Sequence, residues 1–138
     1  ALRLDNVLAV ETGTQDIVCA LTFSYWLLTK RAALLAYFRR VRDSLKPDGV
    51  FFLDAYGGYD AYRLTAEERV IQGDDGLFTY IWDQAHYDPI SGRLICHIHF
   101  AFKDGSRLEQ AFSYDWRLWS LPEIRELLAE AGLAGVPN

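Results

Sequence analysis

The chain has 138 residues, of which 51% are hydrophobic and 24% are charged, and its formal net charge is −5. This length is typical of one domain, and the composition is that of a folded globular protein rather than a disordered one. The acidic charge balance provides no basic surface for nucleic acid, so we expect no nucleic-acid partner. The sequence contains no run of about 18 uncharged apolar residues, so we expect no membrane span.

The first part of the chain predicts a strand, a helix and a second strand. Leu2–Val10 reads as a short strand or strand end, and Asp16–Leu21 (DIVCAL) is an apolar run typical of a strand buried on both faces. From Lys30 to Leu45 the apolar residues recur at helical spacing, which predicts a helix. They are Leu34, Phe38, Val41 and Leu45.

A turn and a second apolar strand follow this helix. Residues 46–49 (KPDG) suit a type I turn, and Val50–Leu53 (VFFL) is again typical of a strand buried on both faces. Strand, helix and strand with short connections form a βαβ unit, whose two strands are parallel. Ligands of such sheets bind beyond the carboxyl ends of the strands, which here are Leu21–Trp26 and Asp54–Gly58.

The middle of the chain predicts an antiparallel meander of three strands. Thr65–Glu68 (TAEE) reads as the start of a short helix or as a loop. Beyond it the sequence is rich in strand-forming residues, with turn residues at 88–92 and 103–105. The three expected strands are Leu77–Gln84, Arg93–Phe102 and Arg107–Trp116.

The last element is a helix with strong end signals. Ser120 and Glu123 have the spacing of a capping box, and Trp119 and Ile124 have that of a hydrophobic staple. Gly132 is expected to end this helix.

The cysteines point to a reducing compartment. Cys19 and Cys96 lie in strand-like runs, away from any Cys-x-x-C motif or Cys/His cluster. We interpret both as reduced thiols of the core and therefore expect a cytoplasmic protein.

Three stretches together resemble class I S-adenosylmethionine-dependent methyltransferases: DIVCALTFSYWLL (16–28), LKPDGVFFLD (45–54) and LLAEAGL (127–133). The resemblance implies an α/β fold with a partial Rossmann-like methyltransferase sheet, into which the meander is inserted before a C-terminal helix. The family's glycine-rich first loop and the acid after its second strand have no counterpart here. The chain also begins with Ala1 rather than Met. We therefore expect residues 1–138 to form a single, incomplete methyltransferase domain.

The resemblance implies S-adenosylmethionine as the cofactor and methyl transfer to a small-molecule acceptor as the activity. In DNVLAV (5–10), Asn6 stands where the family has an acid next to the adenine, Val7 follows, and Asp5 remains an alternative one residue away. The remaining implied cofactor contacts follow the family's fourth strand. They are Ala20, Leu21, Thr22, Phe23, Ser24 and Tyr25. The implied substrate-facing residues are Asp54, Tyr56, Gly57 and Gly58.

Methyl transfer does not require a fixed catalytic triad, because the cofactor carries its own activated methyl group and the protein mainly aligns the reactants. No catalytic residue is therefore assigned. His97 and His99 have an H-x-H spacing that can ligate a metal, but His86 is the only other histidine, so no metal site is predicted.

Two other interpretations stay open from the residues alone. The chain could be a non-catalytic α+β module that binds an apolar ligand, or a dimerisation module with a degenerate methyltransferase fold. A homodimer is compatible with the enzyme as well.

Overall fold

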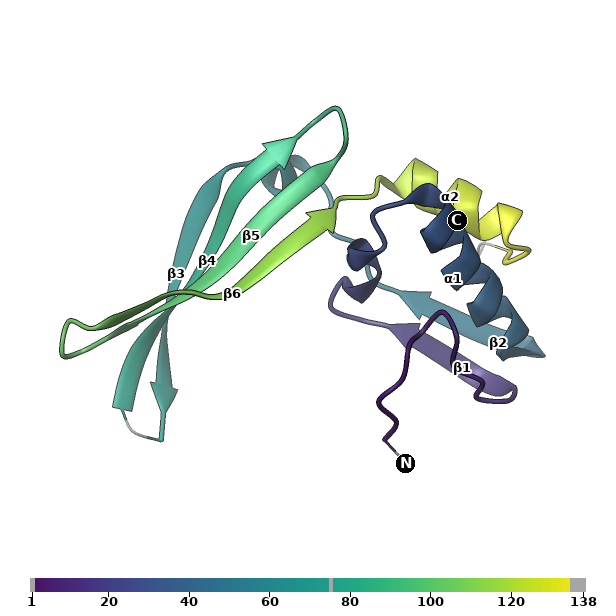
Figure 1. The fold of residues 1–138 in the computed structure, drawn as a ribbon, viewed down its shortest axis with the longest axis horizontal. Coiled ribbons are helices and arrows are strands. Elements are labelled where there is room, and N and C mark those ends of the chain that lie inside the picture. The colour runs from purple at the N-terminus through teal and green to yellow at the C-terminus, as the bar shows by residue number, and fades with distance from the viewer. Residues whose placement is uncertain (1, 75, 135–138) are drawn as a thin grey trace. The chain divides into compact units, whose positions relative to one another are not determined.

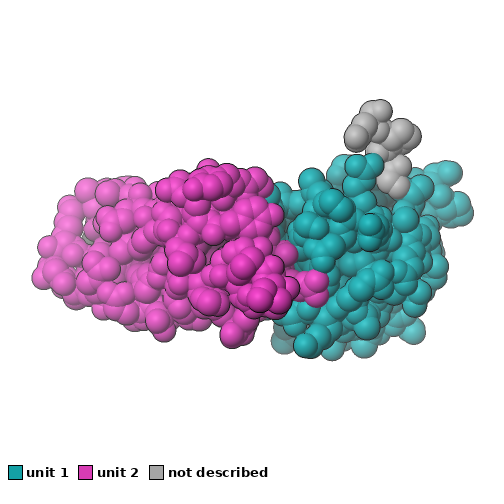
Figure 2. Space-filling view, turned by 90° about the horizontal axis from the view of Figure 1, so that it is seen from above, with its two compact units in different colours: residues 1–57, 119–138 teal, residues 58–118 magenta. Residues whose placement is uncertain are grey.

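The computed structural model describes residues 2–74 and 76–134 (Figure 1). The chain folds into two compact units, one made of residues 1–57 and 119–138 and the other of residues 58–118 (Figure 2). The meander, which was expected as an insertion, thus belongs to a separate unit. In the sequence, this unit lies between the two parts of the first unit. None of the helices in the described ranges is long and apolar enough to cross a membrane.

The first unit contains the predicted βαβ arrangement. Strand β1 (Gln15–Ala20) and strand β2 (Leu45–Leu53) pair in parallel, and helix α1 (Arg31–Asp43) connects them after a short 3-10 helix, η1 (Ser24–Leu27). Helix α1 covers one face of the pair, where the ring of Phe38 lies 6.0 Å from that of Phe51. The parallel pairing confirms that the carboxyl ends of β1 and β2 lie side by side.

The other face of this strand pair is exposed, which corrects the expectation of strands buried on both sides. Ile17 and Phe52 on that face are 59% and 53% exposed. Cys19 is also exposed, so it is a free surface thiol rather than a core residue. Cys96 is free and buried as expected, and its burial raises the pKa of the thiol to about 12.

Residues 46–49 lie inside strand β2 rather than in a turn before it. Gln15 pairs with Leu45 and Ile17 with Val50, so β2 advances five residues while β1 advances two. This irregularity is tightly packed, because a Cβ on Gly49 would lie 2.9 Å from Leu45 Cδ2 and 3.0 Å from the Gln15 carbonyl oxygen. The glycine of the KPDG motif therefore permits a close approach within the sheet.

The prediction of a strand at Leu2–Val10 is wrong. Asp5 accepts a hydrogen bond from the backbone N–H of Asn6, and the Asn6 side chain accepts one from Leu8. The Asn6 carbonyl also accepts from the N–H groups of Ala9 and Val10. Asp and Asn side chains that bond nearby backbone in this way favour turns over strands.

Helix α2 (Leu121–Glu130) has the predicted ends. Ser120 and Glu123 form the reciprocal bonds of a capping box. Gly132 ends the helix with φ +83°, a conformation that favours glycine. Helix α2 is held to α1 by an ion pair between Arg31 and Glu130 and by a 3.0 Å hydrogen bond from Arg42 to the Ala131 carbonyl.

The second unit is an antiparallel sheet in the order β3-β4-β5-β6. Its strands are β3 (Thr65–Gly73), β4 (Gly76–Asp88), β5 (Arg93–Phe102) and β6 (Arg107–Arg117), preceded by a short 3-10 helix, η2 (Tyr59–Tyr62). The three strands of the expected meander are confirmed as β4, β5 and β6.

The expectation of a helix or loop at Thr65–Glu68 is wrong, because these residues begin strand β3. Strand β3 pairs with β4 over its whole length and is exposed along nearly all of it. An edge strand exposed on both faces can carry charged residues on either side. The alternation that reveals a half-buried strand is therefore missing from this part of the sequence.

Candidate functional site

The carboxyl ends of β1 and β2 are joined by a partly buried hydrogen-bond network around Asp54. Asp54 directly follows β2, and its carboxylate accepts hydrogen bonds from the backbone N–H groups of Thr22 (2.6 Å) and Phe23 (3.1 Å). The backbone N–H of Asp54 in turn donates to the Ala20 carbonyl at 3.4 Å. The end of the second strand therefore fixes the path of the chain as it leaves the first.

That path is strained. Thr22 and Phe23 have φ values of +59° and +54°, in the left-handed region that β-branched and bulky residues rarely adopt. Each such residue costs on the order of 1–3 kcal/mol, and hydrogen bonds to a charged group contribute about 1.5–3 kcal/mol each. The free energy contributed by the two bonds to Asp54 is therefore similar to the strain of the two residues, which is enough to stabilise this bend.

Aromatic rings gather where the bend ends. Phe23 stacks on Trp26 with ring centroids 4.8 Å apart, and Tyr56 lies 5.9 Å from Phe23 and 6.3 Å from Trp26. Trp26 is buried, whereas Phe23 and Tyr56 are only half-buried. The exposed parts of these two rings form an aromatic surface beside the strand ends.

Tyr25, in the same segment, is also bonded to Asp54. Its hydroxyl donates to the Asp54 carbonyl at 2.9 Å. Burial, as the main cause, raises the pKa of Tyr25 to about 12, so the phenol stays protonated at neutral pH. Tyr25 is therefore placed as a hydrogen-bond donor within the protein, not as a base.

The structure brings together five of the residues expected at the site: Thr22, Phe23, Tyr25, Asp54 and Tyr56. Of the neighbouring expected residues, Ala20 is buried at the end of β1, Leu21 is exposed and Ser24 begins η1. A Cβ added to Gly57 would meet no other atom within 4 Å, and Gly58, with φ +87°, belongs to the second unit.

The two residues expected near the adenine lie in the segment before β1. Val7 lines a cavity of about 630 Å³ together with residues of β1 and α1. None of the residues from Ala20 to Tyr25 lines this cavity, nor does Asn6. The assignment of Asn6 and Val7 to a cofactor therefore stays a prediction.

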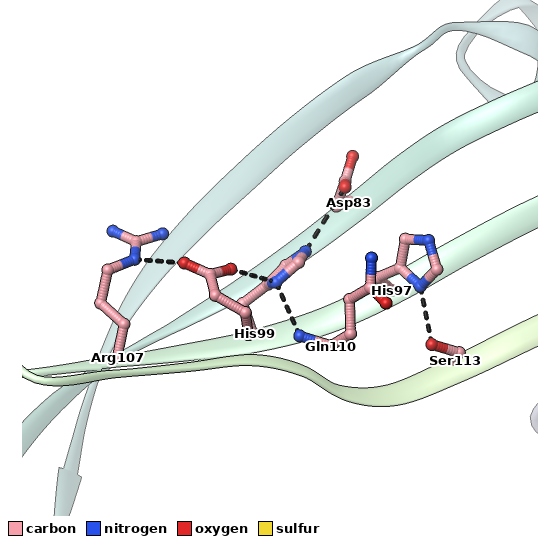
Figure 3. Close-up of polar contacts among 7 residues, drawn as sticks. Asp83, His97, His99, Arg107, Gln110 and Ser113 are labelled. Carbon is pink, nitrogen blue, oxygen red and sulfur yellow. Dashed lines mark hydrogen bonds and ion pairs between the residues drawn. The ribbon is translucent and has the colours of Figure 1, made fainter.

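The histidines of the H-x-H motif are engaged across the sheet of the second unit (Figure 3). His99 lies between two carboxylates, with Nε2 3.4 Å from Asp83 and Nδ1 2.6 Å from Glu109, and Nδ1 is also 3.0 Å from the N–H of Gln110. His97 Nδ1 contacts the Ser113 hydroxyl at 2.8 Å. Among the described residues, no group of three or more His, Cys, Asp or Glu is arranged to hold a metal ion.

The sequence did not reveal that Phe23 and Tyr56 form one surface. The resemblance assigned Phe23 to the cofactor and Tyr56 to the substrate, whereas their rings are neighbours. A signal was present, because each parallel strand is followed within three residues by an aromatic side chain.

Comparison with solved structures identifies the architecture. The chain is similar to an S-adenosylmethionine-dependent methyltransferase from Clostridium acetobutylicum ATCC 824, with 19% identity, a TM-score of 0.70, and coverage of 94% of this chain and 52% of that one. It is also similar to KedS8, a sugar N-methyltransferase from Streptoalloteichus sp ATCC 53650, with 20% identity, a TM-score of 0.69, and coverage of 93% and 52%.

The chain has the fold of part of a class I methyltransferase. A third similar structure is CalS10, an amino pentose methyltransferase from Micromonospora echinaspora, with 14% identity, a TM-score of 0.76, and coverage of 93% of this chain and 54% of that one. The chain spans about half the length of these structures. No family model and no curated protein sequence matches the chain. The methyltransferase resemblance drawn from the motifs is confirmed at the level of fold.

Proposed function

We propose that the chain supplies part of the active site of an S-adenosylmethionine-dependent methyltransferase that acts on a small molecule. One observation carries the proposal. The carboxyl ends of β1 and β2 lie side by side and are linked by the hydrogen bonds of Asp54, and the rings of Phe23 and Tyr56 lie next to them. In parallel sheets such strand ends are where ligands bind. The methyltransferase fold of the chain makes a nucleoside-bearing sulfonium the ligand to test first.

The residues at the strand ends suit this cofactor. When bound, S-adenosylmethionine supplies a methyl group already activated for transfer. Aromatic faces attract a nearby cation, so Phe23 and Tyr56, which pack on the buried Trp26, would hold the sulfonium end. The strained bend at Thr22 and Phe23 fixes the direction of the Phe23 ring before any ligand arrives, which reduces the entropy lost on binding.

The chain's contribution to the chemistry is alignment. Correct placement of two reactants can supply about 7–11 kcal/mol of a reaction barrier in model systems. Tyr25 holds its proton at neutral pH and donates it to the Asp54 carbonyl, and the Asp54 carboxylate accepts from two backbone N–H groups, so we assign both residues to fixing the geometry of the site.

An amine of a small molecule, such as an amino sugar, is the acceptor class that we propose to test first. Two of the similar structures are named as a sugar N-methyltransferase and an amino pentose methyltransferase. A neutral amine is a nucleophile without help from a base, which agrees with a site where no base has been assigned.

The proposal is tested by thermal unfolding with S-adenosylhomocysteine. At about one hundred times its dissociation constant, a ligand that binds only the folded state stabilises it by about 2.7 kcal/mol. Tyr56→Leu should reduce this stabilisation, whereas Tyr59→Leu, at a tyrosine that is 79% exposed, should leave it unchanged. Stabilisation that is absent, or equal in both variants, would contradict the proposal.

The cavity beside α1 gives the binding-module interpretation its own support. It is lined mainly by apolar side chains, including Val7, Val10 and Ile17. If an apolar ligand rather than S-adenosylhomocysteine stabilises the protein, and Val10→Glu abolishes that effect, the non-catalytic interpretation is favoured.

A further inference from the structure

Strand β3 is a long, exposed edge of the sheet in the second unit. It has nine residues, pairs with β4 along one side, and in the described part of the chain no strand runs along its other side (Figure 1). Val70 on this strand is 69% exposed. An exposed edge of this length presents unpaired backbone N–H and C=O groups, which form a template for another strand.

The edge lacks two of the features that usually prevent such pairing. Strand β3 contains no proline, and its register with β4 is unbroken from Thr65 to Gly73. The opposite edge strand, β6, is different, because its register with β5 shifts near Gln110, whose φ is +48°. Bulges of this kind protect an edge, so β3 is the edge available for pairing.

The charges on β3 are arranged as a self-complementary pair. Glu67 lies opposite Trp82 and Arg69 opposite Tyr80, so both charged side chains project on the same face of the sheet, two residues apart. Opposite charges facing each other across antiparallel strands are stabilising, and like charges are destabilising. A strand with one charge of each sign at this spacing matches a reversed copy of itself.

We propose that β3 pairs antiparallel with β3 of a second copy of this chain, about a two-fold axis at Glu68. In this register Glu67 faces the partner's Arg69, and Arg69 faces the partner's Glu67. Ala66 likewise faces the partner's Val70, which covers the exposed valine. Such an interface is isologous, with the same patch on both copies, which is the commonest form of dimer.

This register has one unfavourable contact, and that contact makes the proposal testable in detail. Glu68 lies opposite Ile81 in β4 and therefore projects on the other face from Glu67 and Arg69. At the two-fold axis it would face the partner's Glu68, a like-charge pair. Glu68→Gln should therefore tighten the dimer, whereas loss of a carboxylate elsewhere should not.

The experiment measures the dissociation constant of the dimer by analytical ultracentrifugation of the whole chain. Arg69→Glu and Glu67→Arg should each weaken the dimer by about tenfold or more, because each turns two attractive pairs into repulsive ones. The double variant Glu67→Arg/Arg69→Glu restores opposite charges across the axis and should recover most of the affinity. Lys103→Glu, the same charge reversal at the exposed β5–β6 turn, is the control that should change nothing.

Two results would overturn the proposal. One is a chain that stays monomeric up to the highest soluble concentration. The other is a dimer whose affinity does not follow the charge swap, which would place the interface elsewhere. Circular dichroism of each variant confirms that the fold is retained, and the outcome is independent of cofactor binding.

Discussion

Within residues 2–74 and 76–134, two bends place residues other than glycine in the left-handed region, and they are held in different ways. At the end of β1, the N–H groups of Thr22 and Phe23 donate to the Asp54 carboxylate, which is 31 to 32 residues away in the sequence. In β6, the N–H of Gln110 donates to the His99 ring, 11 residues away on the neighbouring strand. The first bend depends on the parallel pairing of β1 and β2, and the second only on a hairpin.

The comparison separates a candidate binding site from ordinary sheet structure. The first bend is partly buried, lies at strand ends where ligands bind, and aims Phe23 at Tyr56. The second lies in an exposed stretch of β6, and the residues around it contact one another across the sheet. Strain that fixes a ring beside the strand ends is more informative about function than strain within a bulge.

Loss of the Asp54 carboxylate should have the largest effect. Asp54→Ala leaves the N–H groups of Thr22 and Phe23 without their acceptor, and we expect a loss of about 3 kcal/mol in the free energy of unfolding. Asp54→Asn should cost less, because its amide oxygen can still accept one bond. Denaturant unfolding measures both, with Asp48→Ala, at an exposed position, as the control. If Asp54→Ala were as stable as the control, the claim that the Asp54 carboxylate holds the first bend would be contradicted.

Loss of the His99 ring should have a smaller effect on stability. His99→Leu removes the acceptor of the Gln110 N–H, but Gln110 is exposed and water can replace the bond, so we expect a loss of about 1 kcal/mol. The same unfolding assay, with His97→Leu alongside, measures the difference. A loss as large as that of Asp54→Ala would show that the two bends are held equally strongly.

Glycine at either bend should relieve strain. A left-handed conformation costs a residue with a side chain about 1–2 kcal/mol more than it costs glycine, so Gln110→Gly should be stabilising by up to about 1 kcal/mol. Thr22→Gly should also be stabilising, but the same change should weaken the binding of S-adenosylhomocysteine, because the Phe23 ring loses its fixed direction. Thermal unfolding with and without this ligand measures both effects. Unchanged binding in Thr22→Gly would argue against a role for the strained bend in the site.

The smallest expected effect is on the pH dependence of the protein's stability, through Glu109 beside the second bend. Bonding to Arg107, and then the nearby His99, lowers the pKa of the Glu109 carboxyl below its usual 4.5. A carboxyl whose pKa is lower in the folded state contributes stability above the unfolded pKa, and that contribution is lost as pH falls. Unfolding measured between pH 7 and pH 3 should show a slightly shallower decline in Glu109→Gln than in the parent protein. A steeper decline in the variant would contradict this sign.

Much of the fold could be predicted because its strands and helices are marked locally. The apolar runs DIVCAL and VFFL with a helix between them were sufficient for the parallel pair, and Ser120 with Glu123 was sufficient for the start of α2. The errors have local causes as well. The side chains of Asp5 and Asn6 bond to nearby backbone where a strand was expected.

The site was only partly predictable, because its geometry arises from tertiary contacts. Asp54 was expected at a strand end, but Thr22 and Phe23 have little intrinsic tendency to adopt positive φ. The Asp54 carboxylate, which directly follows β2, stabilises them there by accepting from both of their N–H groups. The sequence therefore indicates where the site lies, while the bend that shapes it depends on the pairing of residues about 30 positions apart.

The most direct test of the proposed site is an NMR titration of the ¹⁵N-labelled protein with S-adenosylhomocysteine. We predict saturable shifts of the backbone amides of Thr22, Phe23 and Tyr56, and little change in the sheet of residues 65–117. Shifts confined to that sheet or to the cavity at Val7 and Val10, or no shifts at millimolar ligand, would contradict the account.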